Sequence, residues 1–313
     1  MAMVVALFAA CSGGGTGSES NGSGDTPSTS TAAAEGPTTT APAVAADDDA
    51  PVVVVTGDIV CDPRARGNGS ADTCQHGATA AVVEAIDPDA VLIVGDLQYE
   101  KGEYANFVEA YEPTWGRFRD RTYPAPGNHE YATAGAAGYF RYFGDRAGRA
   151  AEGWHASTIG EWRVIALNSN CDKVACGPGS VQERWLRNEL RSNPAPCTLA
   201  FWHHPRYSSG LHGSSSATEA LWAALAEAGA DVVLAGHDHH YERFAPERGI
   251  RSFVVGTGGK SLYPVVRSTP GSEVYNATTY GVLELRLGAA GFAWRFASAN
   301  GAPFTDSGSA RCH

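Results

Sequence analysis

Five apolar runs along this chain are each followed by a polar side chain that can bind a metal ion or a proton. The first of them, residues 51–56, is an uninterrupted run of β-branched residues after Pro51, which is typical of a strand buried on both faces. The runs span residues 51–56, 90–94, 123–126, 198–202 and 231–235, and the polar residues after them are Asp58, Asp96, Asn128, His203, and the pair His237 and His239. In sheets with parallel strands, sites form beyond the carboxyl ends of the strands. The pattern therefore predicts one sheet edge where these side chains meet.

Helical patterns separate these runs. They cover residues 76–86, 104–115, 180–190 and the segment from 216 to the strand at 231, and the last two begin with capping-box spacings, Ser180 to Glu183 and Ser216 to Glu219. Further strands are expected at 154–159, 162–168, 251–255, 280–287 and 292–297, the last three with period-two alternation that predicts antiparallel strands. Alternating strands and helices followed by strands predict an α/β sandwich with mixed β-sheets, forming one domain over residues 51–313.

The residue types at the strand ends have a common chemistry. Carboxylates, an amide oxygen and imidazoles suit transition-metal ions better than Ca²⁺ or Mg²⁺. One carboxylate can bridge two ions, and two ions a few ångströms apart suit attack on phosphorus. Each residue alone is equally well explained as a turn residue or a satisfied polar pair. Their recurrence at the same place on successive strands favours a shared metal site.

Five ordered motifs strengthen this interpretation. They are GD (57–58), GDLQY (95–99), GNHE (127–130), FWHHP (201–205) and GHDHHYER (236–243). The set, spread over about residues 51 to 300, resembles the calcineurin-like metallophosphoesterases and, within them, the purple acid phosphatases. Val60 stands where the generic family has a histidine, and Tyr99 stands where purple acid phosphatases have a tyrosine. The alternative for Tyr99 is an ordinary surface tyrosine.

The resemblance implies a four-layer α/β/β/α sandwich with two mixed β-sheets and a centre with two metal ions. One metal would be bound by Asp58, Asp96, Tyr99 and His239, and the other by Asp96, Asn128, His203 and His237, with Asp96 bridging. The first set is hard and oxygen-rich, which favours Fe³⁺. The second site would take Zn²⁺, Fe²⁺ or Mn²⁺.

Three more histidines have expected roles by the same resemblance. His129 would face the substrate phosphate, with Glu130 orienting its ring. His212, nine residues after His203, matches the spacing of a histidine that helps to protonate the leaving group; the alternative is an exposed loop histidine. His204 is expected near the metals or the substrate.

Two residues within GHDHHYER are expected to have no part in metal binding. Asp238 and His240 alternate with the ligand histidines, so in an extended segment their side chains point away from the metals. Their expected contacts are with solvent or with residues behind the site.

The first fifty residues differ in composition from the rest. Residues 1–11 resemble a bacterial lipoprotein signal with Cys11 as the lipidated residue, which predicts export and either a lipid anchor at the cell surface or secretion. Residues 12–50 are rich in Gly, Ser, Thr, Pro and Ala and predict a disordered linker. Six acidic and no basic residues lie in residues 1–50, so the remainder is only mildly acidic. No basic nucleic-acid stripe and no second membrane span is evident in the sequence.

The six cysteines after Cys11 favour disulfides in an exported protein. Cys61–Cys74 and Cys171–Cys176 would close short loops, which leaves Cys197–Cys312 to hold the carboxyl end. The alternative, a thiolate metal site, lacks any C-x-x-C spacing.

The leading hypothesis is an extracellular hydrolase of phosphate esters, with phosphomonoesters favoured, in which a metal-bound hydroxide attacks phosphorus. The substrate would be a small molecule. A phosphodiesterase or nucleotide hydrolase of the same superfamily is the first alternative. A surface binding protein on an inactive scaffold is the alternative from another class, and its signature would be missing ligands.

Overall fold

Two β-sheets make up the centre of the computed structural model, which describes residues 49–63 and 74–313. The first sheet has the order β13-β12-β11-β1-β2-β3, with bounds β1 Val52–Thr56, β2 Ala90–Val94, β3 Thr122–Ala125, β11 Gly281–Gly288, β12 Gly291–Ser298 and β13 Ser307–Arg311. The second has the order β10-β8-β9-β7-β6-β5-β4, with bounds β4 His155–Ile159, β5 Trp162–Ala166, β6 Cys197–Phe201, β7 Val232–Ala235, β8 Tyr241–Phe244, β9 Arg251–Val255 and β10 Ser272–Asn276.

Both sheets are mixed, as the sequence predicts. In the first sheet β1, β2 and β3 are parallel neighbours, and β11 joins β1 antiparallel. In the second, β5, β6, β7 and β9 are parallel neighbours, while β4, β8 and β10 pair antiparallel. Except for β5 and β9, the parallel strands correspond to the five apolar runs of the sequence, and their carboxyl ends position the polar residues that follow them. The antiparallel prediction for residues 251–255 is wrong on one side, because β9 pairs parallel with β7 and antiparallel only with β8.

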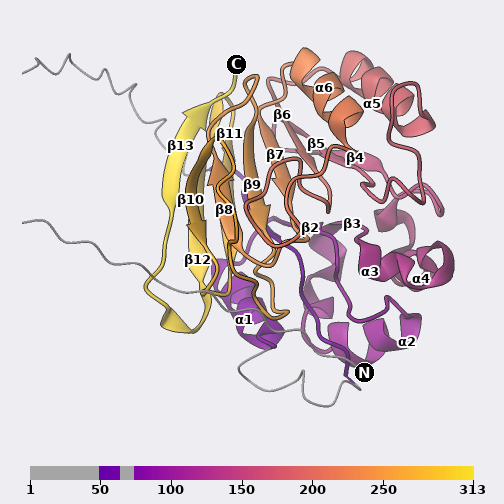
Figure 1. Ribbon diagram of the computed structural model, residues 1–313, viewed down its shortest axis with the longest axis vertical. Coiled ribbons are helices and arrows are strands. Elements are labelled where there is room, and N and C mark those ends of the chain that lie inside the picture. The colour runs from indigo at the N-terminus through magenta and orange to yellow at the C-terminus, as the bar shows by residue number, and fades with distance from the viewer. Residues whose placement is uncertain (1–48, 64–73) are drawn as a thin grey trace, which may run out of the picture. The chain divides into compact units, whose positions relative to one another are not determined.

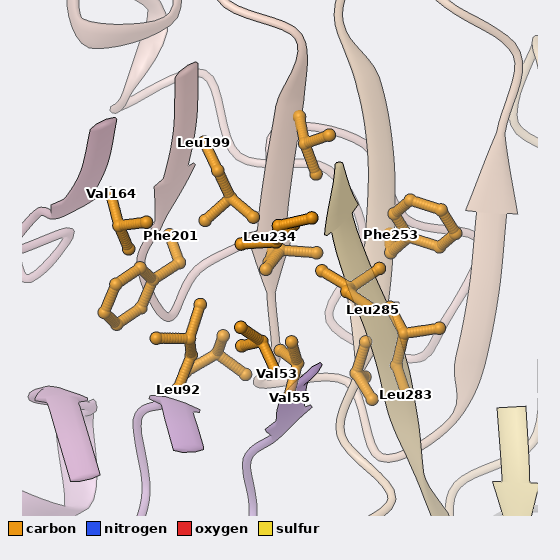
Figure 2. Packing of buried hydrophobic residues seen from close by; sticks show 14 of the residues in the cluster. Val53, Val55, Leu92, Val164, Leu199, Phe201, Leu234, Phe253, Leu283 and Leu285 are labelled. Atoms are coloured by element: carbon orange, nitrogen blue, oxygen red, sulfur yellow. The ribbon is translucent and has the colours of Figure 1, made fainter. Parts of the chain in front are cut away.

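Alternate residues of the strands fill the space between the two sheets. Val53, Val55 and Leu92 of the first sheet pack against Leu199 and Leu234 of the second, and all five are fully buried (Figure 2). Removing apolar surface from water stabilises such a layer by roughly 25 cal/mol per Å². This layer fixes the two sheets relative to each other and hence the two halves of any site that both contribute to.

Helices cover the outer faces of both sheets, which gives the expected α/β/β/α order of layers (Figure 1). The first sheet packs against α1 His76–Ile86, α2 Tyr104–Asn106, α3 Asn128–Tyr131 and α4 Ala137–Phe143, and the second against α5 Val181–Ser192 and α6 Glu219–Glu227. Short 3₁₀ turns lie at Gly116–Arg121, Ala134–Ala136, Gly144–Ala147 and Ala299–Gly301.

Two helix predictions need correction. The helix expected over 104–115 is α-helical only in α2 and continues as a π-helical segment, Phe107–Tyr111, because the Glu112 N–H bonds to the Phe107 carbonyl. The capping box at Ser216 is wrong. Helix α6 starts at Glu219 after Thr218, and Ser216 accepts the Glu219 N–H through its backbone carbonyl, as in a turn. The box at Ser180 is present in part, since its hydroxyl caps the Glu183 N–H.

The three expected disulfides are present: Cys61–Cys74, Cys171–Cys176 and Cys197–Cys312. The last joins β6 to the chain just after β13.

Among the described residues, no helix has both the length and the apolar character needed to cross a membrane. The predicted signal at 1–11, the lipidation of Cys11 and nearly all of the predicted linker at 12–50 lie outside the described residues. The single domain over 51–313 stays a prediction.

Candidate metal centre

The seven residues predicted to bind metal lie together at the carboxyl ends of parallel strands from both sheets. Strands β1, β2 and β3 precede Asp58, Asp96 with Tyr99, and Asn128, and strands β6 and β7 precede His203 and the pair His237 and His239. Ligand atoms of Asp58, Asp96 and His203 lie within 4.8 Å of one another. The sandwich thus joins donor residues that are up to 181 positions apart in the sequence.

Unusual backbone geometry turns these side chains into the site. Asp58, Asp96 and His237 have φ angles of 59°, 49° and 71°, in the left-handed region that costs non-glycine residues about 1–3 kcal/mol each. Such strain persists where the surrounding fold enforces it, and it is concentrated at functional sites.

Two glycines before the donors allow very close packing. A Cβ at Gly127 would lie 2.0 Å from Oδ1 of Asp96, and one at Gly95, whose φ is +92°, would lie 2.5 Å from Nδ1 of His203. Any side chain at either position would displace a donor.

The first donor set surrounds the hydroxyl of Tyr99. That oxygen lies 2.8 Å from Oδ1 of Asp58, 3.0 Å from Oδ2 of Asp96 and 2.9 Å from Nε2 of His239. A phenol has a single proton to donate. It therefore satisfies only one of these three acceptors. The remaining pairs need further positive charge, which a proton on Nε2 of His239 or a metal ion among them would supply.

The second donor set surrounds Nε2 of His203. This nitrogen lies 3.0 Å from Oδ1 of Asn128, 3.2 Å from Oδ2 of Asp96 and 3.2 Å from Nδ1 of His237. The Oδ2 atom of Asp96 belongs to both sets. Asp96 is therefore placed to bridge two ions.

Backbone groups hold the other end of each donor side chain. The Nδ1 atom of His203 lies 2.9 Å from the Val94 carbonyl, and Nδ1 of His239 lies 2.6 Å from the Ser261 carbonyl. An N–H at Nδ1 donates to each carbonyl, so in the neutral ring the lone pair that can bind a metal ion is on Nε2.

The two carboxylates are oriented in the same manner. Oδ1 of Asp96 accepts the His129 N–H, and Oδ2 of Asp58 accepts the His237 N–H, both at 2.9 Å. One oxygen of each carboxylate is thereby held, and the other is directed to the shared cluster.

The donor set fits metal ions on chemical grounds. Adjacent ligands at about 2.1 Å from one ion stand about 3 Å apart when they subtend a right angle. The spacings around Tyr99 and His203 are close to this value. Lone pairs of oxygen and nitrogen atoms that face each other at this distance are repulsive unless a proton or a metal ion separates them. Asp58, Asp96, Tyr99 and His239 would hold one ion, and Asp96, Asn128, His203 and His237 the other.

The pKa values of the donors also favour a cation. Burial lowers the pKa of His203, but the carboxylates of Asp96 and Asp58 outweigh it and raise that pKa to about 9. Burial, followed by Asp58 and Asp96, raises the pKa of Tyr99 well above its usual 10. Burial and then His203 lower the pKa of His237 to about 2, so this ring offers a lone pair at neutral pH. Metal binding must displace a proton from His203 and one from Tyr99.

His129 lies against the Tyr99 ring of the first donor set. Its ring centroid is 4.2 Å from that of Tyr99, and its Nδ1 lies 2.7 Å from the Glu100 carbonyl. The expectation that Glu130 orients this ring is wrong. Glu130 is fully buried and accepts the backbone N–H groups of Asp96, Leu97, Gln98 and Gly127. Glu130 therefore holds the loop that carries Asp96 through these hydrogen bonds. The same four N–H groups occupy its carboxylate, which has no contact with solvent.

The rings of His204 and His212 both lie beside the ring of His237, a member of the second donor set. The ring centroids of His204 and His212 lie 4.5 Å and 4.4 Å from that of His237. The Ser169 hydroxyl accepts the backbone N–H groups of His203 and His204, so its own proton is donated to Nδ1 of His204, 2.9 Å away. Burial and then His203 lower the pKa of His204 to about 4, so it is neutral, with its proton on Nε2.

Asp238 and His240 point away from the donor atoms, as predicted, but they are buried and not in solvent. Asp238 accepts hydrogen bonds from Ser208, His212 and Gly213. His240 contacts Glu242 through Nε2 at 3.0 Å.

Tyr263 and Lys260 are site residues that the sequence analysis does not identify. The Tyr263 ring stacks on His239 at 4.0 Å between centroids and 10° between planes, and Nζ of Lys260 lies 4.9 Å from the Tyr99 ring centroid while pairing with Glu100. Both follow β9, which is also parallel to its neighbour β7. The available signal was the polar segment that follows the strand expected at 251–255.

Comparison with known proteins agrees with this geometry. The family model for calcineurin-like phosphoesterase matches residues 51–241. An uncharacterised protein of Mycobacterium tuberculosis is 29% identical over 60% of this chain and 40% of its own length. Probable purple acid phosphatase 20 of Arabidopsis thaliana is 28% identical over 51% of this chain and 41% of its own, and Fe(3+)-Zn(2+) purple acid phosphatase 12 of the same plant is 30% identical over 49% and 37%.

Solved structures share the fold. Purple acid phosphatase PPD1 from yellow lupin superposes with a TM-score of 0.66 at 20% identity, over 83% of this chain and 53% of its own. GAP50, described as the anchor in the inner membrane complex of Plasmodium, reaches 0.60 at 13% identity, over 83% and 89%. The chain spans less than half the length of the curated relatives named above. It belongs to the calcineurin-like phosphoesterase family and is similar within it to the purple acid phosphatases.

Proposed function

We propose that this protein hydrolyses phosphomonoesters of small molecules at a centre with two metal ions. The observation that carries the proposal is the convergence of two donor sets on one shared carboxylate oxygen, Oδ2 of Asp96. The exposed or half-buried rings of His129, His204 and His212 at the mouth of the same cluster support it.

The two donor sets support different ions. Tyr99 with two carboxylates forms a hard, oxygen-rich set suited to Fe³⁺. Asn128 with two imidazoles forms a softer set suited to Zn²⁺, Fe²⁺ or Mn²⁺. The Fe³⁺ and Zn²⁺ in the name of the Arabidopsis relative support this assignment. Bound there, such ions lower the pKa of a water molecule and stabilise the charge that develops on the phosphoryl group.

The histidines at the mouth bind and orient the ester. His204 donates from Nε2, since Ser169 occupies its Nδ1. His129 has Nδ1 engaged with the Glu100 carbonyl, which leaves Nε2 for a phosphate oxygen. His212 delivers a proton to the leaving oxygen from a ring N–H. Positioned proton transfer of this kind contributes roughly 10²–10⁴-fold.

The protein acts outside the cytoplasm in this proposal. Three disulfides support an oxidising compartment, where such bonds form and persist. A lipid on Cys11 would hold the protein at the cell surface, and release without it would make the protein secreted.

A binding protein on the same scaffold is the competing class. GAP50 shares the fold and is described as an anchor, so the fold alone does not decide activity. The ligand set favours the enzyme, because all seven predicted donors are present and converge.

The test compares the purified chain with Asp96→Ala. After loading with iron and zinc, the native chain is expected to hydrolyse 4-nitrophenyl phosphate and to contain two metal ions per chain. Losing the shared carboxylate removes several kcal/mol of transition-state stabilisation, so Asp96→Ala should lose about a thousandfold or more in kcat/KM. The exposed Asp120→Asn variant serves as the matched control.

Two outcomes would separate the alternatives. A native chain that binds two metal ions but hydrolyses no ester would favour the binding protein. Faster hydrolysis of bis(4-nitrophenyl) phosphate than of the monoester would favour the phosphodiesterase.

A further inference from the structure

Asp238 lies between the two donor histidines of GHDHHYER and is completely buried. Its carboxylate accepts three hydrogen bonds from one segment, residues 208–213. Ser208 donates its hydroxyl at 2.5 Å, and the backbone N–H groups of His212 and Gly213 donate at 2.8 and 3.0 Å. The carboxylate therefore fixes the backbone of His212 itself.

The other side of residues 208–213 is also held. Arg267 donates to the carbonyls of Gly210 and Leu211, and the Thr269 hydroxyl donates to the Ser208 carbonyl at 2.9 Å. The Val266 N–H donates to the Ser209 carbonyl at 3.0 Å. The segment is thus clamped between Asp238 and residues 266–269, although it has no regular secondary structure.

The packing against Asp238 requires a glycine. A Cβ at Gly210 would lie 2.4 Å from Cγ of Asp238. The backbone at position 210 therefore lies too close to the carboxylate for any side chain to fit between them. This close approach lets one side chain bind both Ser208 and the two N–H groups beyond Gly210.

The clamp has a clear consequence for the ring of His212. The side chain is exposed, yet its centroid lies 4.4 Å from that of His237 and 5.6 Å from that of Tyr263. An exposed histidine on a free loop would lose conformational entropy each time it met a substrate. A backbone that is already fixed removes much of this cost.

We propose that Asp238 is a positioning residue that holds His212 in place to protonate the leaving oxygen, and that this arrangement suits the site to alkyl phosphates. The inference rests on the proposed function. In the step concerned, a P–O bond forms to the oxygen of water and the P–O bond to the leaving group breaks. The leaving oxygen keeps the bonding pair and takes a proton from a ring N–H of His212, and the proton lost by the water restores the ring.

The substrate class follows from the leaving group. A nitrophenolate is a stable anion and departs without a proton, whereas an alkoxide is strongly basic and departs readily only when protonated. A histidine held at the mouth therefore matters most for alkyl phosphates. Asp238 should affect the two kinds of ester unequally, because it acts only through His212.

The experiment uses the full-length metal-loaded chain and its Asp238→Asn variant. The amide keeps the size of the side chain but directs an NH₂ group at N–H donors, so it no longer holds both of them. Hydrolysis of glycerol 3-phosphate should fall about tenfold to a hundredfold in kcat, and that of 4-nitrophenyl phosphate less than about threefold. Metal content should be unchanged, and Asp120→Asn should behave like the native chain.

Two further measurements separate positioning from general damage. With glycerol 3-phosphate, the double variant Asp238→Asn/His212→Ala should be no slower than His212→Ala alone, because both changes remove the same step. Hydrogen exchange at residues 208–213 should be faster in Asp238→Asn, and this readout does not depend on activity. If Asp238→Asn does not fold, Ser208→Ala weakens the same clamp and should show the same unequal effect on the two esters.

Equal losses on both esters, additive losses in the double variant or loss of a metal ion would overturn the proposal. A native chain that hydrolyses neither ester would instead contradict the proposed function. In that case the exchange measurement still reports whether Asp238 holds the loop.

Discussion

The two donor sets differ in their access to solvent. In the first, Asp58, Tyr99 and His239 are 0%, 1% and 2% exposed. In the second, His203 is fully buried, but Asn128 and His237 are only half-buried, and His204 and His212 lie beside His237. We call the first set the sealed set, because its donors are buried and Tyr263 stacks on His239. We call the second set the open set, because Asn128 and His237 are partly exposed.

The donors differ in chemistry as well as in access. The sealed set is rich in anionic oxygen, which suits a tightly held trivalent ion. The open set has two imidazoles and a neutral amide, which suit a divalent ion that exchanges more readily. Asp96 links them. We infer that one set retains its ion while the other governs substrate turnover, and three predictions test this difference.

The largest expected effect is the difference between the Asn128→Ala and Tyr99→Phe variants in metal content, visible absorption and activity. A Tyr99 phenolate bound to Fe³⁺ should give a visible charge-transfer band. Asn128→Ala removes a donor of the open set, so the second metal ion and about a hundredfold or more of the phosphatase activity should be lost while this band remains. Tyr99→Phe removes the phenolate, so the charge-transfer band should disappear with a smaller loss of activity. Metal analysis, a visible spectrum and an assay measure all three properties.

Tyr263→Phe is the matched control for that pair, because Tyr263 lies in the site without belonging to either donor set. It should keep the band. Loss of colour in Asn128→Ala would show that the sets are not independent. A colourless, fully active zinc or manganese form of the native chain would contradict the iron assignment.

The next effect concerns protons released on metal binding. In the metal-free chain the pKa of His203 is raised to about 9 against a usual 6.5, so its ring carries a proton at pH 7 and has lost it by pH 10. Tyr99 keeps its proton at both pH values because its pKa is raised well above 10. Zn²⁺ added to weakly buffered protein should therefore release fewer protons at pH 10 than at pH 7.

Variants assign that proton to the open set. The difference between the two pH values should become smaller in His203→Gln and persist in Tyr99→Phe. An undiminished difference in His203→Gln would assign the protons to other groups.

The smallest effect concerns the sealed set alone. Lys260 lies 4.9 Å from the Tyr99 ring centroid, and its positive charge stabilises the electrons of a phenolate. Lys260→Met should therefore shift the charge-transfer band to longer wavelength with little change in activity. The exposed Lys173→Met should leave the band in place. A shift to shorter wavelength would contradict this account of the lysine.

Regular hydrophobic patterns predicted most of the fold. Helix α1 at His76–Ile86 and strands β2 and β9 have the expected bounds. Strands β8, β10 and β13 were missed. Strand β13, Ser307–Arg311, consists mainly of small residues, and it is a strand because β12 pairs with it and Cys312 ties the end of the chain to Cys197. Its own sequence carries no period-two signal.

The candidate site was predictable where donors follow buried strands, because the strand pattern and the motif occur together. Supporting residues were less predictable. Glu130 looks like a partner for the adjacent His129, yet it binds four backbone N–H groups of two loops. Asp238 was expected to contact solvent or residues behind the site, but the sequence does not indicate that it holds a segment 26 positions away.

The sequence by itself determined the kind of site: which residues offer donors, in what order, and on which strands, because these depend on residue type and on local periodicity. Only the tertiary structure decided how open each donor set is and which side chains hold the donors and His212 in place. Burial and buried hydrogen bonds arise when distant segments meet, as Asp238 meets His212 and Lys260 meets Tyr99. No local pattern records which segments will meet, and so no local pattern records these roles.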